Sequence, residues 1–244
     1  MTADRKTTQA EIIRLIRTNR ISSTEIADCL NKSGQLCEGL VAITQGHFRV
    51  GRVSYIYAAA ESNYPVHQGL EKIDPDTVVV VDAFDCQDKA LFGNLVAKYA
   101  ILYRQSQALI ALGKLRDVPH LIREAYPIWC LGFSPIGCSN DPVDLAPYRL
   151  RINERKKSLD GCVAICDDSG VVVIPREAER NFIEKLHWIE HLEDVWFDCI
   201  DRRKWSTFDT VCLKRYENEP SSNIIYGKIP ETEQNSKAGE ADRQ

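Results

Sequence analysis

Hydrophobic and polar positions in the middle of the chain switch between strand-like and helix-like periods. Residues 78–81 are four consecutive valines, and such an unbroken apolar run is typical of a strand that is buried on both faces of a sheet. Helical spacing follows over residues 91–103, where Leu95 and Tyr99 recur on one stripe, and a second apolar run occupies residues 108–112. This order of elements predicts an α/β fold whose parallel strands are joined by right-handed crossovers.

The same patterning predicts elements over most of the remaining chain. Further helices are expected in residues 8–31, 118–124 and 177–216, and further strands in residues 39–60, 127–133, 162–166 and 170–175. A polar segment rich in arginine and lysine, residues 149–157, separates the third strand of the α/β run from the last two.

Composition and charge narrow the classes of function. The chain has 244 residues and a net charge of −4, and this mild acidity argues against nucleic acid as the main ligand, which needs a clustered basic surface. No apolar run reaches the roughly 18 residues that a membrane span needs. The charged N-terminus contains no apolar signal segment, and the nine cysteines form no CxxC motif. We therefore expect reduced thiols, no membrane association and a cytoplasmic location.

A candidate anion site lies at the start of the helix that follows the valine strand. The sequence Ala-Leu-Phe-Gly-Asn-Leu places Gly93 at this helix start. The first backbone N–H groups of a helix have no partner within the helix, and the helix dipole favours a negative charge there. A carboxylate or phosphate could bind the amides of residues 93–96, although Gly93 could equally serve only to pack the helix against the sheet.

A second candidate follows the strand at residues 108–112. Arg116 and Asp117 come directly after its expected carboxyl end, where ligands gather in open α/β sheets. An arginine can hold an oxyanion through its guanidinium fork, and an aspartate can bind a hard divalent cation. A solvated loop pair or a local salt bridge is the alternative interpretation.

A third pattern is a weaker candidate. Residues 187–191 match H-x-x-E-H, a zinc motif that places His187 and His191 on one helix face. The sequence offers no identifiable third ligand, so a surface or interface role is the better interpretation of these histidines.

Taken in order, six segments resemble the family named after regulator of ribonuclease activity A, which includes the 4-hydroxy-4-methyl-2-oxoglutarate/4-carboxy-4-hydroxy-2-oxoadipate aldolases. The resemblance runs from Ile21 to Tyr216, and its segments are ISSTEIADCLNKSG, DPDTVVVVDA, ALFGNLVAKYA, ALIALGKLRDV, GCVAICDDSGVVVIP and the last helices.

The resemblance implies a swivelling β/β/α sandwich with flanking N- and C-terminal helices. It divides the chain into an N-terminal helical extension (residues 1–20), an RraA-like domain that includes the C-terminal helices (residues 21–216) and a polar, flexible tail (residues 217–244). It also implies self-association as a trimer or a hexamer, with active sites at the subunit interfaces.

The resemblance further implies a divalent-metal-dependent carbon–carbon lyase that acts on a small 2-oxo acid, by retro-aldol cleavage or by decarboxylation of the oxaloacetate type through a pyruvate enolate. The substrate carboxylate would bind the amides of Gly93, Asn94, Leu95 and Val96. Arg116 would stabilise the enolate, and Asp117 would anchor Mg²⁺ or Mn²⁺. Glu193, or alternatively Glu190, would act in the site of a neighbouring subunit as in class II (metal-dependent) aldolases of this kind.

Several positions depart from the family pattern. Leu112 stands where an aspartate is usual, Lys114 adds a positive charge that could bind substrate, and Asp160, Gly161 and Cys162 replace a proline-glycine-aspartate sequence. Two other functions therefore stay open, a non-catalytic RraA-like regulator or binding protein and a divergent enzyme that acts on a sugar or sugar acid.

Overall fold

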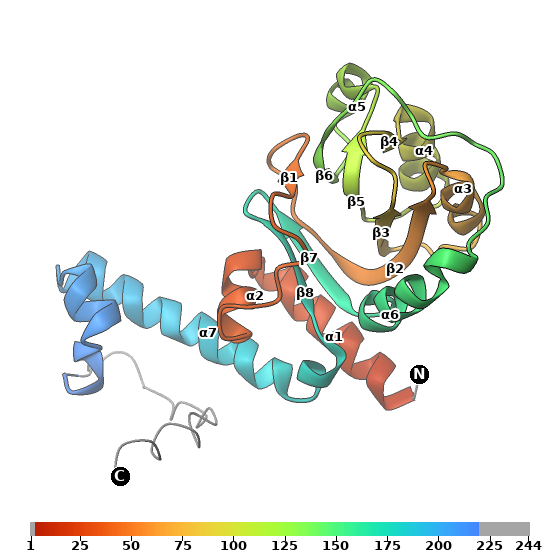
Figure 1. Ribbon diagram of the computed structural model, residues 1–244. Helices are drawn as coiled ribbons and strands as arrows, with labels where there is room; N and C mark the ends of the chain where they lie inside the picture. Colours follow the sequence, from red (N-terminus) through yellow and green to blue (C-terminus); the bar gives the residue numbers. More distant parts are fainter. Residues whose placement is uncertain (1–2, 220–244) are drawn as a thin grey trace, which may run out of the picture. The chain divides into compact units, whose positions relative to one another are not determined.

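An eight-stranded mixed sheet forms the centre of the first of two units into which the chain divides, residues 1–186 and residues 187–244 (Figure 1). The computed structural model describes residues 3–219. Seven strands follow the order β1-β6-β5-β3-β2-β7-β8, and β4 pairs with β5 beside this path. The strands are β1 (Val41–Ala42), β2 (Arg49–Ala59), β3 (Thr77–Phe84), β4 (Ala90–Phe92), β5 (Ala108–Leu115), β6 (Ile128–Phe133), β7 (Val163–Asp167) and β8 (Gly170–Ile174).

Helices connect these strands. The α-helices of the first unit are α1 (Ala3–Asn19), α2 (Ser23–Cys29), α3 (Tyr64–Leu70), α4 (Asn94–Lys98), α5 (Val118–Glu124) and α6 (Arg149–Leu159), with shorter turns η1 (Tyr99–Tyr103), η2 (Ala146–Tyr148) and η3 (Arg176–Asn181). Strands β2, β3, β5 and β6 pair in parallel, whereas β1, β7 and β8 pair antiparallel to their neighbours. The predicted α/β fold with parallel crossovers is confirmed.

The four-valine run lies at the centre of the sheet and is buried on both faces. Val79 and Val81 belong to a core that includes residues of α3, α4 and α5, whereas Val78 and Val80 belong to a second core with residues of α6, β7 and β8. Successive side chains of a strand point to opposite faces, so an unbroken apolar run satisfies two cores at once. The sheet is thus curved, so that β7 and β8 pack into the same core as β3 and β5.

The structure corrects two expectations about local structure. Leu91 and Phe92, which begin the helix predicted over residues 91–103, belong to β4 instead, because Ala90 and Phe92 pair with Lys114 and Leu115 of β5. The polar segment 149–157 is helical, as most of α6, although only Ile152 and Leu159 of that helix are buried. Two buried apolar positions that are seven residues apart are too few to show a helical hydrophobic period in the sequence. The packing of α6 against the sheet therefore decides its conformation.

The N-terminal helix is tied to the sheet unit rather than extending from it. Glu179 of η3 is almost fully buried, and both of its carboxylate oxygens accept hydrogen bonds from the guanidinium of Arg5 at 2.6 and 2.8 Å. Gln9 donates to the same carboxylate at 2.7 Å and to the carbonyl of Gly161 at 2.8 Å. These contacts hold α1, which the sequence suggested as an N-terminal helical extension, in the same unit as the strands.

The second unit consists of the end of α7 (Phe182–Phe197), which crosses the division at Leu186, and the turns η4 (Asp198–Arg202), η5 (Phe208–Cys212) and η6 (Arg215–Glu217). The C-terminal helices, which we expected inside the main domain, lie largely in this second unit, and the predicted domain boundaries stay a prediction. Most of the predicted polar tail, residues 220–244, lies outside the described residues. Among residues 3–219, no helix is both long enough and apolar enough to cross a bilayer.

Candidate active site

The predicted anion site is built where β4 turns into α4. Gly93 precedes the first helical residue, so the amides of residues 93–96 are the N–H groups that lack an acceptor within the helix. The amide of Asn94 donates to Oδ2 of Asp117 at 3.0 Å. A carboxylate at this position also interacts favourably with the positive end of the helix dipole. The protein itself therefore engages one of the four amides.

Gly93 is required by this arrangement because the backbone approaches the Arg116–Asp117 segment closely. A Cβ atom at residue 93 would lie 2.2 Å from Oδ2 of Asp117 and 2.9 Å from Cγ of Arg116. The amide of Arg116 donates to the carbonyl of Phe92 at 3.1 Å, which holds the two segments together. The two motifs, whose contacting residues Asn94 and Asp117 are 23 positions apart in the sequence, thus form one site.

Asp117 turns the chain from β5 into α5 with a left-handed backbone, at a φ of 62°. Few residues adopt this conformation readily, and aspartate is one of those that do. The sharp turn leaves Arg116 and Asp117 exposed beyond the end of β5. Backbone geometry that is costly elsewhere is often kept where side chains must be aimed at a ligand.

The guanidinium of Arg116 lies against the backbone of the loop after β6. A Cβ atom at Gly137 would come within 2.5 Å of Nη1 of Arg116, so a larger residue there would displace the guanidinium. Among residues 3–219, no carboxylate forms an ion pair with Arg116. The guanidinium thus lies close to the backbone at Gly137, and its charge is available to a ligand.

These segments meet at a pocket of about 400 Å³. Its walls come from the carboxyl ends of neighbouring parallel strands, as expected for a ligand site in an α/β sheet. The pocket is lined by Asn63, Tyr64, His67, Phe92, Gly93, Leu95, Val96, Arg116, Asp117 and Asn140. The structure therefore brings together five of the residues that the sequence predicts for the site, and Asn94 lies directly beside them.

Sequence reasoning missed the contribution of the segment after β2. Asn63 is buried, its Nδ2 donates to the carbonyl of Leu91 at 3.1 Å, and its Oδ1 has no hydrogen-bond partner among the described residues. His67 lies one turn further along α3. The sequence Asn-Tyr-Pro after a strand is a helix-start signal. Combined with the rule that ligands gather at strand ends, it could have identified this wall of the pocket.

Lys114, predicted to bind substrate, is placed elsewhere. Its ammonium lies 2.7 Å from Oδ1 of Asp88, and this hydrogen bond holds the pKa of the Asp88 carboxyl below its ordinary value. Lys114 lines a different pocket, of about 410 Å³, together with Cys86 and Lys89. Lys114 lies within β5, whereas Arg116 lies beyond the end of that strand, so the alternation of side chains along β5 does not place the two on one face.

Glu193, the predicted acidic contributor from a neighbouring subunit, belongs to the second unit as part of α7. Its role stays a prediction. The zinc interpretation of the same helix gains no support: His187 lies 3.7 Å from Glu190, and residues 3–219 contain no cluster of three potential metal ligands.

The residues at the pocket fit a divalent cation that is held mostly by water and substrate. Asp117 supplies one carboxylate, of which Oδ2 is already hydrogen-bonded to Asn94. Mg²⁺ typically binds one or two carboxylates and keeps several water ligands. The donor set agrees with such a site and disagrees with a metal that is enclosed by protein ligands.

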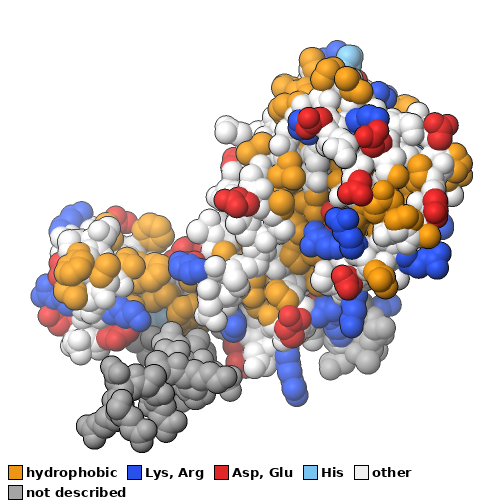
Figure 2. Space-filling model, in the orientation of Figure 1, with side chains coloured by type: hydrophobic (Ala, Val, Ile, Leu, Met, Phe, Trp, Pro, Cys, Tyr) orange, Lys and Arg blue, Asp and Glu red, His pale blue; other side chains and the backbone are white. Residues whose placement is uncertain are grey.

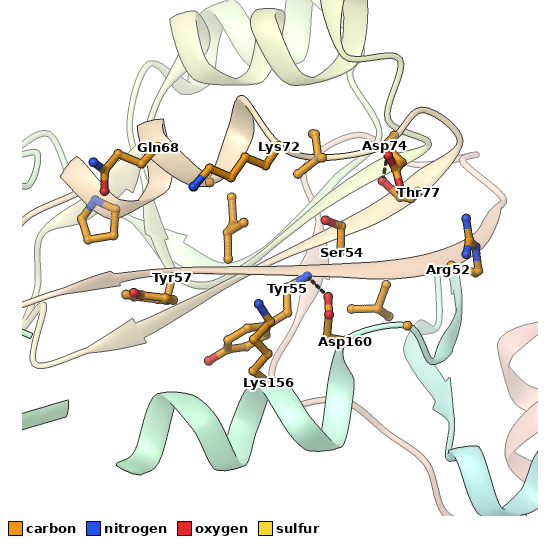
Figure 3. A pocket seen from close by; sticks show the side chains of 16 residues that line it. Arg52, Ser54, Tyr55, Tyr57, Gln68, Lys72, Asp74, Thr77, Lys156 and Asp160 are labelled. Carbon is orange, nitrogen blue, oxygen red and sulfur yellow. Dashed lines mark hydrogen bonds between the residues drawn. The ribbon is translucent and has the colours of Figure 1, made fainter. Parts of the chain in front are cut away.

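A further polar pocket, of about 450 Å³, lies along the open edge of β2 between α3 and α6 (Figure 3). Strand β7 pairs with β2 only up to Arg52, and the amide of Tyr55 donates to Oδ1 of Asp160 at 3.0 Å. Lys72 and Lys156 approach this edge from opposite sides (Figure 3). The pocket contains none of the predicted site residues, so it is a less favourable candidate for the active site.

Comparison with known proteins adds the family to this geometry. The sequence profile of the RraA-like family, described as Aldolase/RraA, matches residues 23–173. The chain belongs to the RraA-like family. The match covers the central sheet, the start of α4 and the Arg116–Asp117 pair.

Individual relatives of this RraA-like chain are distant. A Halalkalibacterium halodurans protein provisionally named as a 4-hydroxy-4-methyl-2-oxoglutarate aldolase is 25% identical over 184 residues, which are 72% of this chain and 83% of the relative.

Two solved structures share the fold. One, an uncharacterized protein from Pseudomonas syringae pv. tomato, matches with a TM-score of 0.64 at 17% identity and covers 84% of this chain and 94% of its own. The other, from Streptomyces coelicolor, is described as an unusual member of the RNase ES inhibitor RraA protein family. It matches with a TM-score of 0.59 at 22% identity, over 75% of this chain and 94% of its own. Family membership therefore establishes the fold, and the evidence for an enzymatic activity has to come from the residues of the pocket.

Proposed function

We propose that this RraA-like chain is a divalent-metal-dependent carbon–carbon lyase that acts on a small 2-oxo acid through a pyruvate enolate. One observation carries the proposal. A single pocket is lined by an arginine without an acidic partner among residues 3–219, a carboxylate and the amide-rich start of a helix. Retro-aldol cleavage and decarboxylation of an oxaloacetate-type acid produce the same enolate, so this arrangement suits both reactions.

The chain's own residues provide binding and charge stabilisation. The amides of Leu95 and Val96, which lie in the first turn of α4 at the positive end of its dipole, suit the substrate carboxylate. The guanidinium of Arg116, seated on Gly137, suits the keto oxygen and the negative charge that develops on it.

Asp117 would hold Mg²⁺ or Mn²⁺ through its carboxylate and bridging water. When bound, the metal supplies a Lewis acid that stabilises the enolate oxygen. Aldolases of this type in the family generally depend on a divalent metal. The hydrogen bond from Asn94 fixes the orientation of the Asp117 carboxylate and leaves Oδ1 for this purpose.

We further propose that the active protein is a trimer or a hexamer with interfacial sites. RraA-like proteins are typically oligomeric. On α4 and the following turn η1, the side chains of Leu95, Leu102 and Tyr103 are exposed to solvent, and the exposed fraction of Leu95 is 79%. The rings of Tyr99 and Tyr103 stack with their centroids 6.1 Å apart. Hydrophobic side chains are also exposed over the region of α5 (Figure 2). Such a face beside a pocket suits a neighbouring subunit, which would also be the source of Glu193.

The direct test is pyruvate release by the purified protein with Mg²⁺ or Mn²⁺, from 4-hydroxy-2-oxo acids and from oxaloacetate. We expect turnover with at least one substrate, its loss after treatment with a chelator and its return when metal is added back. Spontaneous metal-catalysed decarboxylation is subtracted with a protein-free sample. A folded protein that releases no pyruvate from any of these acids would contradict the proposal and favour the non-catalytic regulator.

Replacing Asn63 with alanine is expected to lower kcat/KM by about tenfold, mainly through KM, because one neutral hydrogen bond contributes about 0.5–1.5 kcal/mol. The buried and unpartnered Oδ1 in the pocket wall motivates the prediction. Gln68, an exposed residue on α3 outside this pocket, provides the control Gln68→Ala. Equal kinetics of Asn63→Ala and the control would exclude Asn63 from substrate binding.

The third possibility, an enzyme that acts on a sugar or sugar acid, was motivated by Lys114. Because Lys114 pairs with Asp88 and lines another pocket, the structure removes that support.

All nine cysteines are free thiols, which supports the cytoplasmic location that we propose.

A further inference from the structure

Strand β2 has an open edge beside the polar pocket that lies between α3 and α6 (Figure 3). Its pairing with β3 runs without a shift from Arg52 to Ala59, so alternate residues of β2 direct their amides and carbonyls toward β3 and away from it. The amide of Ala60 donates to the carbonyl of Phe84 in β3 at 2.9 Å, which assigns the even-numbered residues to β3. The odd-numbered residues therefore direct their backbone groups to the other edge.

These odd-numbered residues show which part of the edge is covered. Both backbone groups of Val53 are hydrogen-bonded to the residues just before β7, and both of Ala59 to the turn after β2. The amide of Tyr55 donates to Oδ1 of Asp160 at 3.0 Å. Within the part of the chain that the structure describes, the carbonyl of Tyr55 and both backbone groups of Tyr57 have no hydrogen-bond partner. Three consecutive backbone groups are thus open between two covered ends, and such groups are a template for another strand.

The two helices beside this edge restrict what can reach it. Leu70 of α3 shares a core with Ile56 on one face of β2, and Ile152 of α6 shares a core with Tyr55 on the other face. The open groups therefore lie in a recess between α3 and α6, with a volume of about 450 Å³. A single extended segment fits such a recess, whereas the sheet edge of a folded second copy would meet both helices before it reached β2.

The charges in the recess favour a segment with acidic side chains. Lys72 and Lys156 approach the edge from opposite sides (Figure 3), and neither forms an ion pair with another described residue. The lining contains three cations, these lysines and Arg52, and two carboxylates, Asp74 and Asp160. One of the two carboxylates, that of Asp160, already accepts a hydrogen bond from the backbone. The recess thus has an excess of positive charge that is available to a partner.

The positions of the two lysines specify a spacing in that segment. Successive side chains of an extended chain point to opposite faces. Two consecutive acidic residues would therefore reach Lys72 on the α3 side and Lys156 on the α6 side. A single acidic residue, or two that are separated by one position, would reach only one of the lysines.

We propose that the open edge of β2 is a docking site for an extended segment of a partner protein that contains two consecutive acidic residues. The segment adds a short strand to the sheet: one of its residues exchanges two hydrogen bonds with Tyr57, and another donates to the carbonyl of Tyr55. In this mode of recognition the main-chain bonds provide affinity and the side chains provide specificity. The docking site is separate from the pocket of Arg116, so it does not depend on the proposed lyase activity.

Selection from a phage-displayed library of random heptapeptides on the immobilised full-length protein tests the specificity. We expect the enriched peptides to contain two consecutive acidic residues, and we expect this enrichment to be lost in Lys156→Glu. Lys157→Glu is the matched control, because Lys157 follows on the same helix but does not line the recess. No enrichment of consecutive acidic residues, or an equal loss in Lys157→Glu, would overturn the proposal.

Calorimetry with a synthetic copy of the most enriched peptide measures the contribution of each lysine. Exposed ion pairs are weak, so Lys72→Ala and Lys156→Ala should each raise Kd about two- to fivefold, and Lys157→Ala should leave it unchanged. Replacing both acidic residues of the peptide with their amides should raise Kd by about the product of the two factors. Equal affinities for the acidic and the amide peptide would exclude recognition by the lysines.

Amide hydrogen exchange, followed by NMR, tests the added strand itself. The amide of Tyr57 should exchange rapidly in the free protein and about tenfold more slowly when the peptide is about 90% bound, whereas the amide of Tyr55 should change little. Binding without protection of Tyr57 would refute strand addition. Sedimentation of Lys156→Glu without peptide should give the mass of the unmodified protein. A smaller assembly would assign this edge to a contact between copies of the chain and overturn the proposal.

Discussion

Replacing Arg116 with alanine is expected to lower kcat/KM for pyruvate release by about 100- to 1,000-fold, which corresponds to about 2.7–4 kcal/mol of transition-state stabilisation. The side chain is exposed, and no acidic group among the described residues pairs with it, so its removal leaves no buried charge unpaired. The loss should appear mainly in kcat, because the enolate carries more negative charge than the substrate ketone. Steady-state kinetics with saturating metal provide the measurement.

Lys114→Ala is the matched control for this prediction. The two cations are two residues apart in sequence, yet Lys114 pairs with Asp88 at another pocket. A surface ion pair of this kind contributes about 0–1 kcal/mol, so stability and kinetics should both stay close to those of the unmodified protein. If Lys114→Ala lost as much activity as Arg116→Ala, general electrostatic attraction would explain the effect, and the specific role of Arg116 would be wrong.

Replacing Gly93 with alanine is expected to destabilise the protein by about 1–3 kcal/mol and to lower kcat/KM by about 100-fold or more. The added carbon would lie 2.2 Å from Oδ2 of Asp117 and 2.9 Å from Cγ of Arg116, so both side chains must move. The hydrogen bond from Asn94 to Asp117 would break at the same time. Urea unfolding and steady-state kinetics measure the two effects.

A double variant separates this steric cause from a general effect of alanine on the turn. In Gly93→Ala combined with Asp117→Ala, the closest clash is absent, so much of the lost stability should return while activity stays low. Two substitutions in contact are expected to be non-additive in this way. Strictly additive losses would show that Asp117 does not press against residue 93.

Local patterns in the sequence were sufficient for the central sheet and for the two halves of the candidate site. The run of valines indicated a strand with two buried faces, and β3 indeed serves two cores. The same kind of reasoning was insufficient for α6, whose conformation depends on packing, and for β4, whose pairing with β5 decides its conformation. Short segments of this type have weak intrinsic preferences, so contacts from distant parts of the chain decide between helix and strand.

The sequence by itself determined the α/β class, the helix start near Gly93 and the position of the adjacent Arg116 and Asp117 after a strand end, because each depends on neighbouring residues and on periodicity. Only the tertiary structure decided that Asp117 engages Asn94, that Arg116 rests on Gly137 and that Lys114 faces another pocket. It also brought Asn63 to the site. These contacts join segments that are far apart in the chain, and they arise from the way the strands align at their carboxyl ends, which no local pattern of residues records.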